Sequence, residues 1–180
     1  MEADGPRILV PGDCYIVAEK KPFRAFEMFR QFVEDGVPTL ALCRMPPHQV
    51  RKIFGSYPPR YHWISRSRTT EGVSAVTNLG MVVHHVSRFL DEALGPGVIL
   101  LEGLEYLVNN NGFSSVIRVM EDIQDLMATS RSILLLPVYM EAFDPREAAI
   151  LERGLEVVES ADEISFPSKE DWVVADNGDE

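Results

Sequence analysis

Two lysines followed by a proline stand directly after the first apolar segment of the chain, where a phosphate-binding loop would have to lie. Residues 18–25 read AEKKPFRA, with Lys20 and Lys21 but without a glycine, serine or threonine. A phosphate-binding loop needs glycines, because backbone N–H groups must approach the phosphates, and it needs a Ser or Thr hydroxyl for Mg²⁺. Pro22 also lacks an N–H. The sequence therefore predicts no working phosphate loop and no hydrolysis of ATP or GTP, and two lysines on a turn are typical of a solvated surface.

Two glutamates, Glu102 and Glu105, follow an apolar run and are the best-placed acids in the chain. Open α/β sheets place their ligand sites at the carboxyl ends of strands. These acids therefore indicate a remnant metal or partner site or, more simply, a cap or ion pair for the next loop. Asn109, Asn110 and Asn111 precede a glycine, a combination typical of turns. We expect the three amides to shape that loop, with recognition of a polar ligand as the functional alternative.

The other reactive side chains favour structural roles. His84 and His85 are adjacent, so on a helix their side chains diverge by about 100° and do not share a metal. A phosphoacceptor role is the functional alternative to a surface or packed histidine. Cys14 and Cys43 lie in apolar segments, where cysteine packs as a small hydrophobe. No Gly-x-Ser-x-Gly elbow is present to activate a serine. We predict a protein that is not an enzyme and that holds neither a metal nor a cofactor.

Charge is unevenly distributed along the chain. The formal net charge is −11 at pH 7, and residues 156–180 hold nine acidic side chains against Lys169 alone. Residues 36–70, here called the basic middle, contain no Asp or Glu, and their cations are Arg44, Arg51, Lys52, Arg60, Arg66 and Arg68. This pattern indicates a solvated face with a solubilising tail, or a docking surface for an acidic partner or for the protein's own tail. Nucleic acid is disfavoured, because the tail would repel its phosphates.

Apolar segments that alternate with helical patterns predict the elements that position these residues. Strands are expected at 14–18, 39–43, 61–65, 98–101 and 132–137, with a further edge strand at 163–166. Helices are expected from Pro22 to about 36, from 46 to 54, from about 75 to 93, from about 113 to 128, and from Pro145 to about 157. The longer strands are apolar throughout, which is typical of a parallel sheet covered on both sides. We predict a three-layer α/β fold with a mostly parallel five- or six-stranded sheet.

The composition indicates one domain of 180 residues, of which 46% are hydrophobic. We expect an N-terminal leader (1–11), a single α/β domain (12–166) and an acidic, flexible tail (167–180). An alternative hypothesis is that the tail regulates the domain, with the segment around Trp172 folded onto the basic middle. No apolar run reaches the roughly 18 residues of a membrane span and no signal segment opens the chain, so we expect a cytoplasmic protein that does not enter membranes.

Three stretches read together resemble a known family. They are YIVAEKKPFRAFEMF (15–29), VILLEGLEYLVNNNGF (98–113) and ILLLPVYMEAFDPREAAILERGL (133–155). Over about Gly12 to Val158 the chain resembles the archaeal domain of unknown function 835 family, and LEGLEYLVNNNGF is the most specific part. The resemblance implies a fold and a signalling context but no established activity. The order of elements also resembles the RecA/KaiC-type ATPase core, with Glu102 where a metal-holding Asp is usual and AEKKPFRAF in place of the phosphate loop.

These observations predict a non-catalytic protein-interaction domain of archaeal cytoplasmic signalling, a RecA-like core without its phosphate loop. The strand-end loops would form the contact face, with candidate binding residues Lys20, Lys21, Arg44, Arg66, Arg68, Glu102, Glu105, Asn109, Asn110 and Asn111. The expected partner is a protein with an acidic surface or the chain's own tail, and self-association is a further expectation. The alternative is a nucleotide- or small-anion-binding sensor that uses Arg44, Arg66 and Arg68 with Glu102. The sequence does not identify the partner or the oligomeric state.

Overall fold

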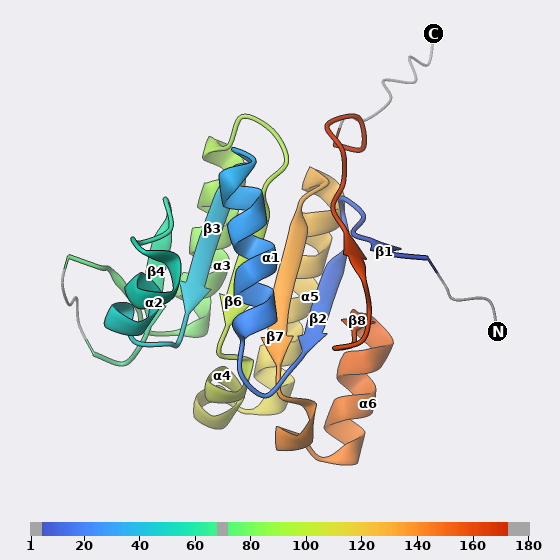
Figure 1. Ribbon diagram of the computed structural model, residues 1–180. Helices are drawn as coiled ribbons and strands as arrows, with labels where there is room; N and C mark the ends of the chain where they lie inside the picture. The colour runs from blue at the N-terminus through green and yellow to red at the C-terminus, as the bar shows by residue number, and fades with distance from the viewer. Residues whose placement is uncertain (1–4, 68–71, 173–180) are drawn as a thin grey trace, which may run out of the picture.

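A seven-stranded parallel sheet forms the centre of the computed structural model, which describes residues 5–67 and 72–172 (Figure 1). The strands follow the order β5 (Ala75–Val76), β4 (Tyr61–Ile64), β3 (Thr39–Cys43), β6 (Val98–Glu102), β7 (Ile133–Val138), β2 (Cys14–Ala18) and β8 (Glu156–Val158). The helices are α1 (Phe23–Glu34), α2 (Pro47–Phe54), α3 (Leu79–Glu92), α4 (Leu104–Asn111), α5 (Phe113–Ser130) and α6 (Pro145–Gly154), with a 3₁₀ helix η1 (Met140–Ala142). All pairings in this sheet are parallel, which confirms the predicted α/β class.

The central strands are buried along their length, as their unbroken apolar sequences require. β6 pairs with β3 from Thr39↔Val98 to Cys43↔Glu102, and it pairs with β7 on its other side. The register brings the carboxyl ends of β3 and β6 level with each other. The residues that follow these two strands are therefore neighbours in space.

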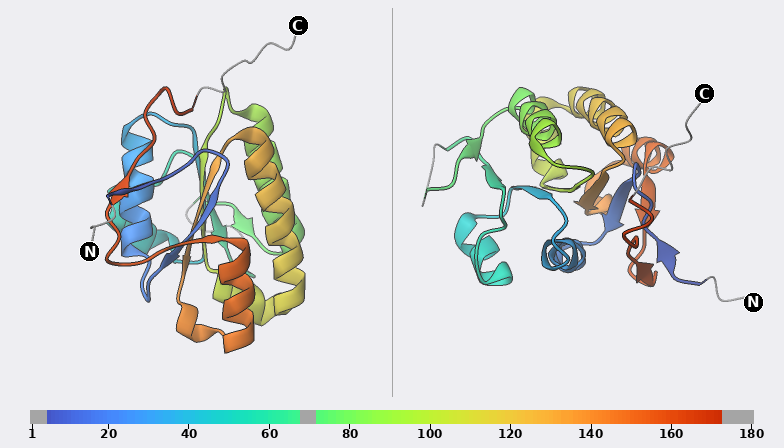
Figure 2. Two further views of the ribbon diagram at one scale, coloured as in Figure 1. Left: turned by 90° about the vertical axis from the view of Figure 1, so that its right-hand side faces the viewer. Right: turned by 90° about the horizontal axis from the view of Figure 1, so that it is seen from above.

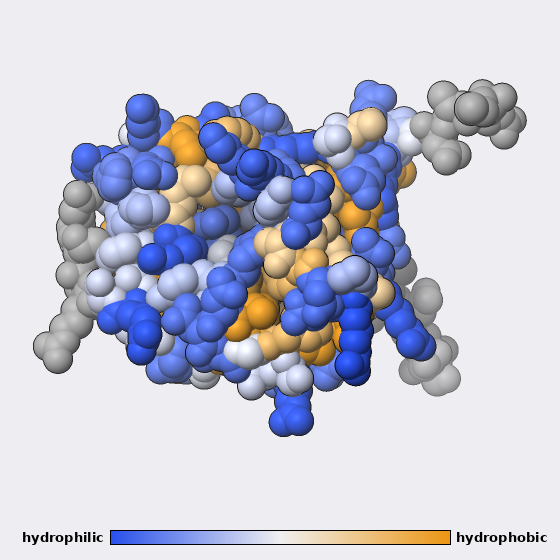
Figure 3. All heavy atoms as spheres, turned by 90° about the horizontal axis from the view of Figure 1, so that it is seen from below, coloured by the Kyte–Doolittle hydropathy of each residue, from blue (hydrophilic) through white to orange (hydrophobic). Residues whose placement is uncertain are grey.

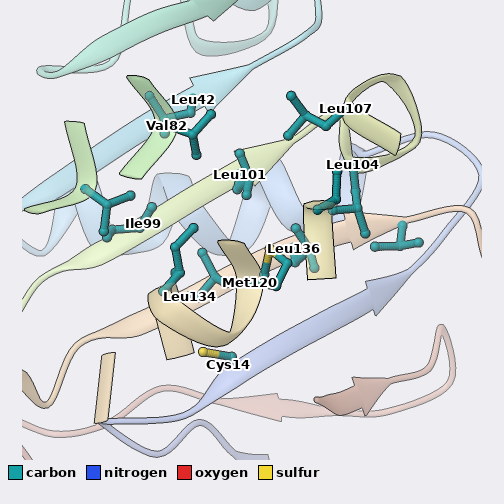
Figure 4. Close-up of a cluster of buried hydrophobic side chains, with 14 of the residues drawn as sticks. Cys14, Leu42, Val82, Ile99, Leu101, Leu104, Leu107, Met120, Leu134 and Leu136 are labelled. Carbon is teal, nitrogen blue, oxygen red and sulfur yellow. The ribbon is translucent and has the colours of Figure 1, made fainter. Parts of the chain in front are cut away.

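Helices cover both faces of the sheet, which gives the predicted three layers (Figure 2). α1 and α2 lie on one face, where Phe26, Phe29 and Val50 are buried. α3, α5 and α6 lie on the other face, and in Figure 4 side chains of β3, β6 and β7 meet Val82 of α3 and Met120 of α5. The apolar core on each face of the sheet also holds one buried free cysteine, Cys43 on the α1 side and Cys14 on the α5 side. This agrees with the structural role predicted for both cysteines.

The sheet has seven strands where five or six were expected, because two short strands lie inside segments that were predicted as helix. β5 has two residues and β8 has three, too few for a periodic pattern to show. The predicted edge strand near 163–166 forms as β9 (Ile164–Ser165), but it pairs with β1 (Arg7–Ile8) in a separate two-stranded sheet. β1 falls within the expected leader, and Leu9 next to it is fully buried.

Arg7 covers the outer edge of β8. Its guanidinium donates to the carbonyl of Val157 and forms ion pairs with Glu156 (2.6 Å) and Asp162 (3.5 Å). β8 is the last strand of its sheet, so Arg7 occupies a main-chain acceptor that no neighbouring strand reaches. Charged side chains on an edge strand discourage pairing with other chains.

The end of the expected domain and the first part of the expected tail lie against α1. Phe166 and Trp172 lie against Phe32, with ring centroids 5.0 and 6.2 Å from it. Trp172 therefore contacts α1, while residues 173–180 lie outside the described part of the chain. Within that described part, no helix is both long enough and apolar enough to cross a membrane.

Candidate functional site

The strand-end face, defined here as the loops after β2, β3, β4, β6 and β7, holds most of the predicted site residues. All five strands are parallel, so these loops meet at one edge of the sheet. Figure 3 views this edge and shows a mainly hydrophilic surface with apolar areas between the polar side chains. The face contains three distinct local structures, at β2–α1, between β3 and β6, and beside α4.

At the β2–α1 turn, the carboxylate of Glu19 caps the first turn of α1. Its oxygens accept hydrogen bonds from the backbone N–H groups of Arg24 (3.0 Å) and Ala25 (3.1 Å). Burial raises the pKa of the Glu19 carboxyl, and the two N–H donors partly oppose that rise. The N-terminus of a helix attracts anions. At the N-terminus of α1, the carboxylate of Glu19 occupies the place that a bound anion would take.

Lys20 and Lys21 precede that helix terminus in the chain. Both side chains are exposed, and the Lys20 ammonium lies 5.8 Å from the ring centre of Tyr139. Lys20 borders an open pocket of about 300 Å³ at the ends of β2, β7 and β8, together with Glu19, Glu141, Glu152 and Glu159. The four carboxylates make this pocket unfavourable for a phosphate.

Between β3 and β6, Glu102 binds backbone groups of the neighbouring loop. Its carboxylate accepts the N–H of Met45 at 2.7 Å, and its carbonyl accepts the N–H of Arg44 at 2.9 Å. Burial raises the pKa of the Glu102 carboxyl, and the nearby Glu105 contributes to the rise. The structure thus gives Glu102 the bonds of a loop cap, the simpler of its two predicted roles.

The side chain of Arg44 packs at the carboxyl ends of β3 and β6. Its guanidinium lies 4.3 Å from the ring centre of Tyr106 and 6.0 Å from that of Trp63, and it donates to the carbonyl of Ile64 at 3.2 Å. Gly103 permits this close packing, because a Cβ on it would lie 2.5 Å from the Cβ of Arg44. Its φ of +117° also favours glycine. Arg44 therefore ties β3, β4 and α4 together.

Glu105 joins the loops after β6 and β7. Its Oε1 accepts the N–H of Tyr139 at 2.7 Å. The Tyr139 hydroxyl in turn donates to Glu141 at 2.6 Å. Both predicted acids of this segment thus accept hydrogen bonds from the backbone of a neighbouring loop.

The three asparagines lie at the end of a helix and not in the turn that the sequence predicted. α4 continues to Asn111 because Leu104 and Leu107 are buried against the sheet, and this packing favours helix. Asn110 and Asn111 donate to the carbonyls of Tyr106 (2.7 Å) and Leu107 (2.9 Å), one turn earlier. Asn109 is exposed.

Arg66 lies near two of these amides. A pocket of about 140 Å³ is lined by Arg66, Asn78, Asn110 and Asn111, among others, at the ends of β4 and β5. Arg66 itself is exposed. Arg68, which was predicted to act beside it, lies outside the described residues.

Sequence reasoning did not single out Glu19, Gly103 or Tyr139. An acid shortly before a helix is a capping signal, so Glu19, three residues before Pro22, could have been found. The contact between Gly103 and Arg44 joins the residues that follow two different strands, and the sequence contains no local signal for it. The same holds for the hydrogen bond between Tyr139 and Glu105.

In the comparison with protein families, one family model matches most of the chain. The family model described as "Protein of unknown function (DUF835)" matches residues 18–155, from the end of β2 to the residue after α6. No curated protein matches the chain. The family that the motifs suggested is thus confirmed, whereas archaeal origin and a RecA-like core stay predictions. The chain belongs to the DUF835 family of proteins of unknown function.

Proposed function

We propose that this chain is a non-catalytic protein-interaction domain of archaeal cytoplasmic signalling, with a RecA-like core whose strand-end face meets the partner. The observation that carries the proposal is the cap on α1. In RecA/KaiC-type ATPases the turn after the first core strand holds phosphate, and here Glu19 accepts the N–H groups of Arg24 and Ala25 in that turn. A phosphate at the same place would meet a carboxylate and lose two donors.

The β3–β6 crevice supports the same proposal. Glu102 directs its carboxylate to the backbone of Met45, and Arg44 stacks on Tyr106. The groups that could hold a metal or polarise a substrate are engaged in joining loops. A face of this kind is suited to present a shaped surface to a macromolecule.

The partner is proposed to be acidic where it meets the basic middle. Arg51 and Lys52 on α2 and Arg66 after β4 are exposed, and the described part of the basic middle carries no acid. Complementary charge speeds encounter and suppresses wrong partners. In a chain of net charge −11, this local excess of cations is distinctive.

The test is capture of partners from extract of the native cells. We expect the wild-type chain to retain a partner that the Arg51→Glu/Lys52→Glu variant loses. A matched control is Arg118→Glu/Arg146→Glu, which makes the same change in charge at exposed positions of α5 and α6. Equal retention by all three proteins would contradict docking on the basic middle.

A second candidate function, a small-anion sensor, is favoured by one observation. The 140 Å³ pocket brings Arg66 together with Asn78, Asn110 and Asn111. Thermal-shift measurements with nucleotides and cyclic dinucleotides separate the two functions. The interaction domain should show no shift, whereas a dose-dependent rise that Arg66→Gln removes would establish the sensor.

A further inference from the structure

An open pocket of about 380 Å³ lies between β4 and α3. It is lined near the start of β3 by Leu40, before β4 by Arg60, and at the end of α3 by Glu92. The pocket therefore lies towards the amino-terminal ends of β3 and β4, away from the strand-end face. None of the interactions described at that face involves it.

Two arginines and one glutamate set the charge of this pocket. Glu92 accepts from Arg60 at 3.0 Å and from Arg88 at 2.8 Å. Each guanidinium thus directs one nitrogen to Glu92, and a guanidinium has five N–H donors. Glu92 is the one acid among the described residues that line the pocket. With neutral histidines the pocket carries an excess of one positive charge.

Two stacked histidines form part of the wall. The ring centroids of His62 and His85 lie 3.9 Å apart, at an interplanar angle of 31°. Within residues 5–67 and 72–172, the buried Nδ1 of His62 has no hydrogen-bond partner. Burial, then His85 and Arg88, lowers the pKa of His62 to about 4. Burial, then His84 and Arg88, lowers the pKa of His85.

Several charged and titratable side chains surround the His62–His85 pair. From β4 and the residue before it come Arg60 and Tyr61, and from α3 come His84, Arg88 and Glu92, whereas Leu40 of β3 carries no charge. The cations disfavour a further positive charge on either imidazole. An anion between the arginines would reverse that effect and favour protonation.

Part of the pocket wall is apolar. Leu40, Pro59 and Phe89 line it, and the Arg60 guanidinium lies 5.5 Å from the ring centre of Phe89. Apolar walls with a few placed charges are typical of small-molecule sites. We propose that this pocket binds a small organic anion, with a carboxylate or phosphate-ester head between Arg60 and Arg88 and an apolar body, and takes up a proton at the His62–His85 pair.

The test is calorimetric titration of the full chain with benzoate, phenyl phosphate and inorganic phosphate at constant ionic strength. Benzoate or phenyl phosphate should bind, and the tighter of the two identifies the head group. Inorganic phosphate should bind more weakly, because it has no apolar body. For benzoate, which stays ionised over this range, affinity should rise about threefold or more between pH 7.5 and pH 5.5, because the protein takes up a proton on binding. Absence of binding by both aromatic probes at millimolar concentration would overturn the proposal without affecting the proposed function.

Substitutions of pocket residues test whether the probes bind in this pocket. Arg88→Gln should weaken binding about tenfold or more, because it removes a charged donor. Glu92→Gln should tighten binding, because it removes the competing carboxylate. The control Arg118→Gln, exposed on α5 and outside the pocket, should bind as the wild type does. Unchanged binding in Arg88→Gln would overturn the site, and loss of the pH dependence in Glu92→Gln would assign the proton to Glu92 and overturn the role of the histidines.

Discussion

The carboxylate of Glu102 accepts the backbone N–H of Met45 at 2.7 Å, and this bond joins the carboxyl ends of β6 and β3. The two residues are far apart in sequence, and the parallel register brings their strands together. The sequence left Glu102 either a remnant metal or partner site or a loop cap, and this bond is that of a loop cap. Its contribution can be measured.

Glu102→Ala should lower the free energy of unfolding by about 1–3 kcal/mol, because it leaves the N–H of Met45 without its acceptor. Glu102→Gln keeps a carbonyl acceptor and removes the cost of a buried charge. Since the folded-state pKa of Glu102 is raised, the folded state binds more protons, and wild-type stability falls as pH rises through that pKa. Glu102→Gln should therefore exceed the wild type in stability at neutral pH.

Urea unfolding of both variants at pH 7 and at about pH 4 checks this result. The advantage of Glu102→Gln should shrink at the lower pH, because protonation of the folded-state carboxyl then removes part of the cost of burying its charge. An advantage that stays constant with pH would show that ionisation of Glu102 does not cause it.

Glu19→Ala should lower the free energy of unfolding by about 1 kcal/mol, because α1 loses its cap. It should also free the N–H groups of Arg24 and Ala25 for an external anion. Inorganic phosphate should then raise the melting temperature of this variant more than that of the wild type. Glu34→Ala, at the opposite end of α1, is the control and should respond as the wild type does.

Gly103→Ala should destabilise the protein by about 3 kcal/mol or more, because a Cβ would lie 2.5 Å from the Cβ of Arg44 at a φ of +117°. Gly55→Ala is a matched control, since Gly55 has a φ of +77° and no atom within 4 Å of its added Cβ. It should cost about 1 kcal/mol. Chemical denaturation gives both values, and equal costs would contradict the close packing of Arg44.

Trp172→Ala should lower the free energy of unfolding by about 1 kcal/mol, because the indole ring packs on Phe32. Lys169→Ala, in the same segment and exposed, should have no measurable effect. Thermal melts followed by circular dichroism suffice. A Trp172→Ala protein with wild-type stability would argue that this segment does not support α1.

The continuous apolar segments made the central sheet predictable. β2 and β3 have the expected bounds because each is buried between two helical layers, so every residue of the two strands except Thr39 is apolar. β8 was missed because Glu156–Val158 has only three residues and directly follows α6. Three residues carry no period that distinguishes strand from helix.

The candidate site was predictable in position but less so in its chemistry. Strand ends can be located from sequence, and Arg44, Glu102 and Glu105 do lie there. Their bonding depends on contacts across the sheet, such as that of Glu105 with Tyr139. The asparagines were misassigned because local turn preference was weighed without the burial of Leu104 and Leu107, which extends α4.

Arg7 has a practical bearing on how the protein is prepared. Its guanidinium holds the carbonyl of Val157 at the open margin of the main sheet. A shortened protein that starts after this residue would leave that acceptor ready to add a strand from another molecule. Expression plasmids that retain the first residues should therefore yield material that stays dispersed at high concentration, whereas trimmed versions should form aggregates.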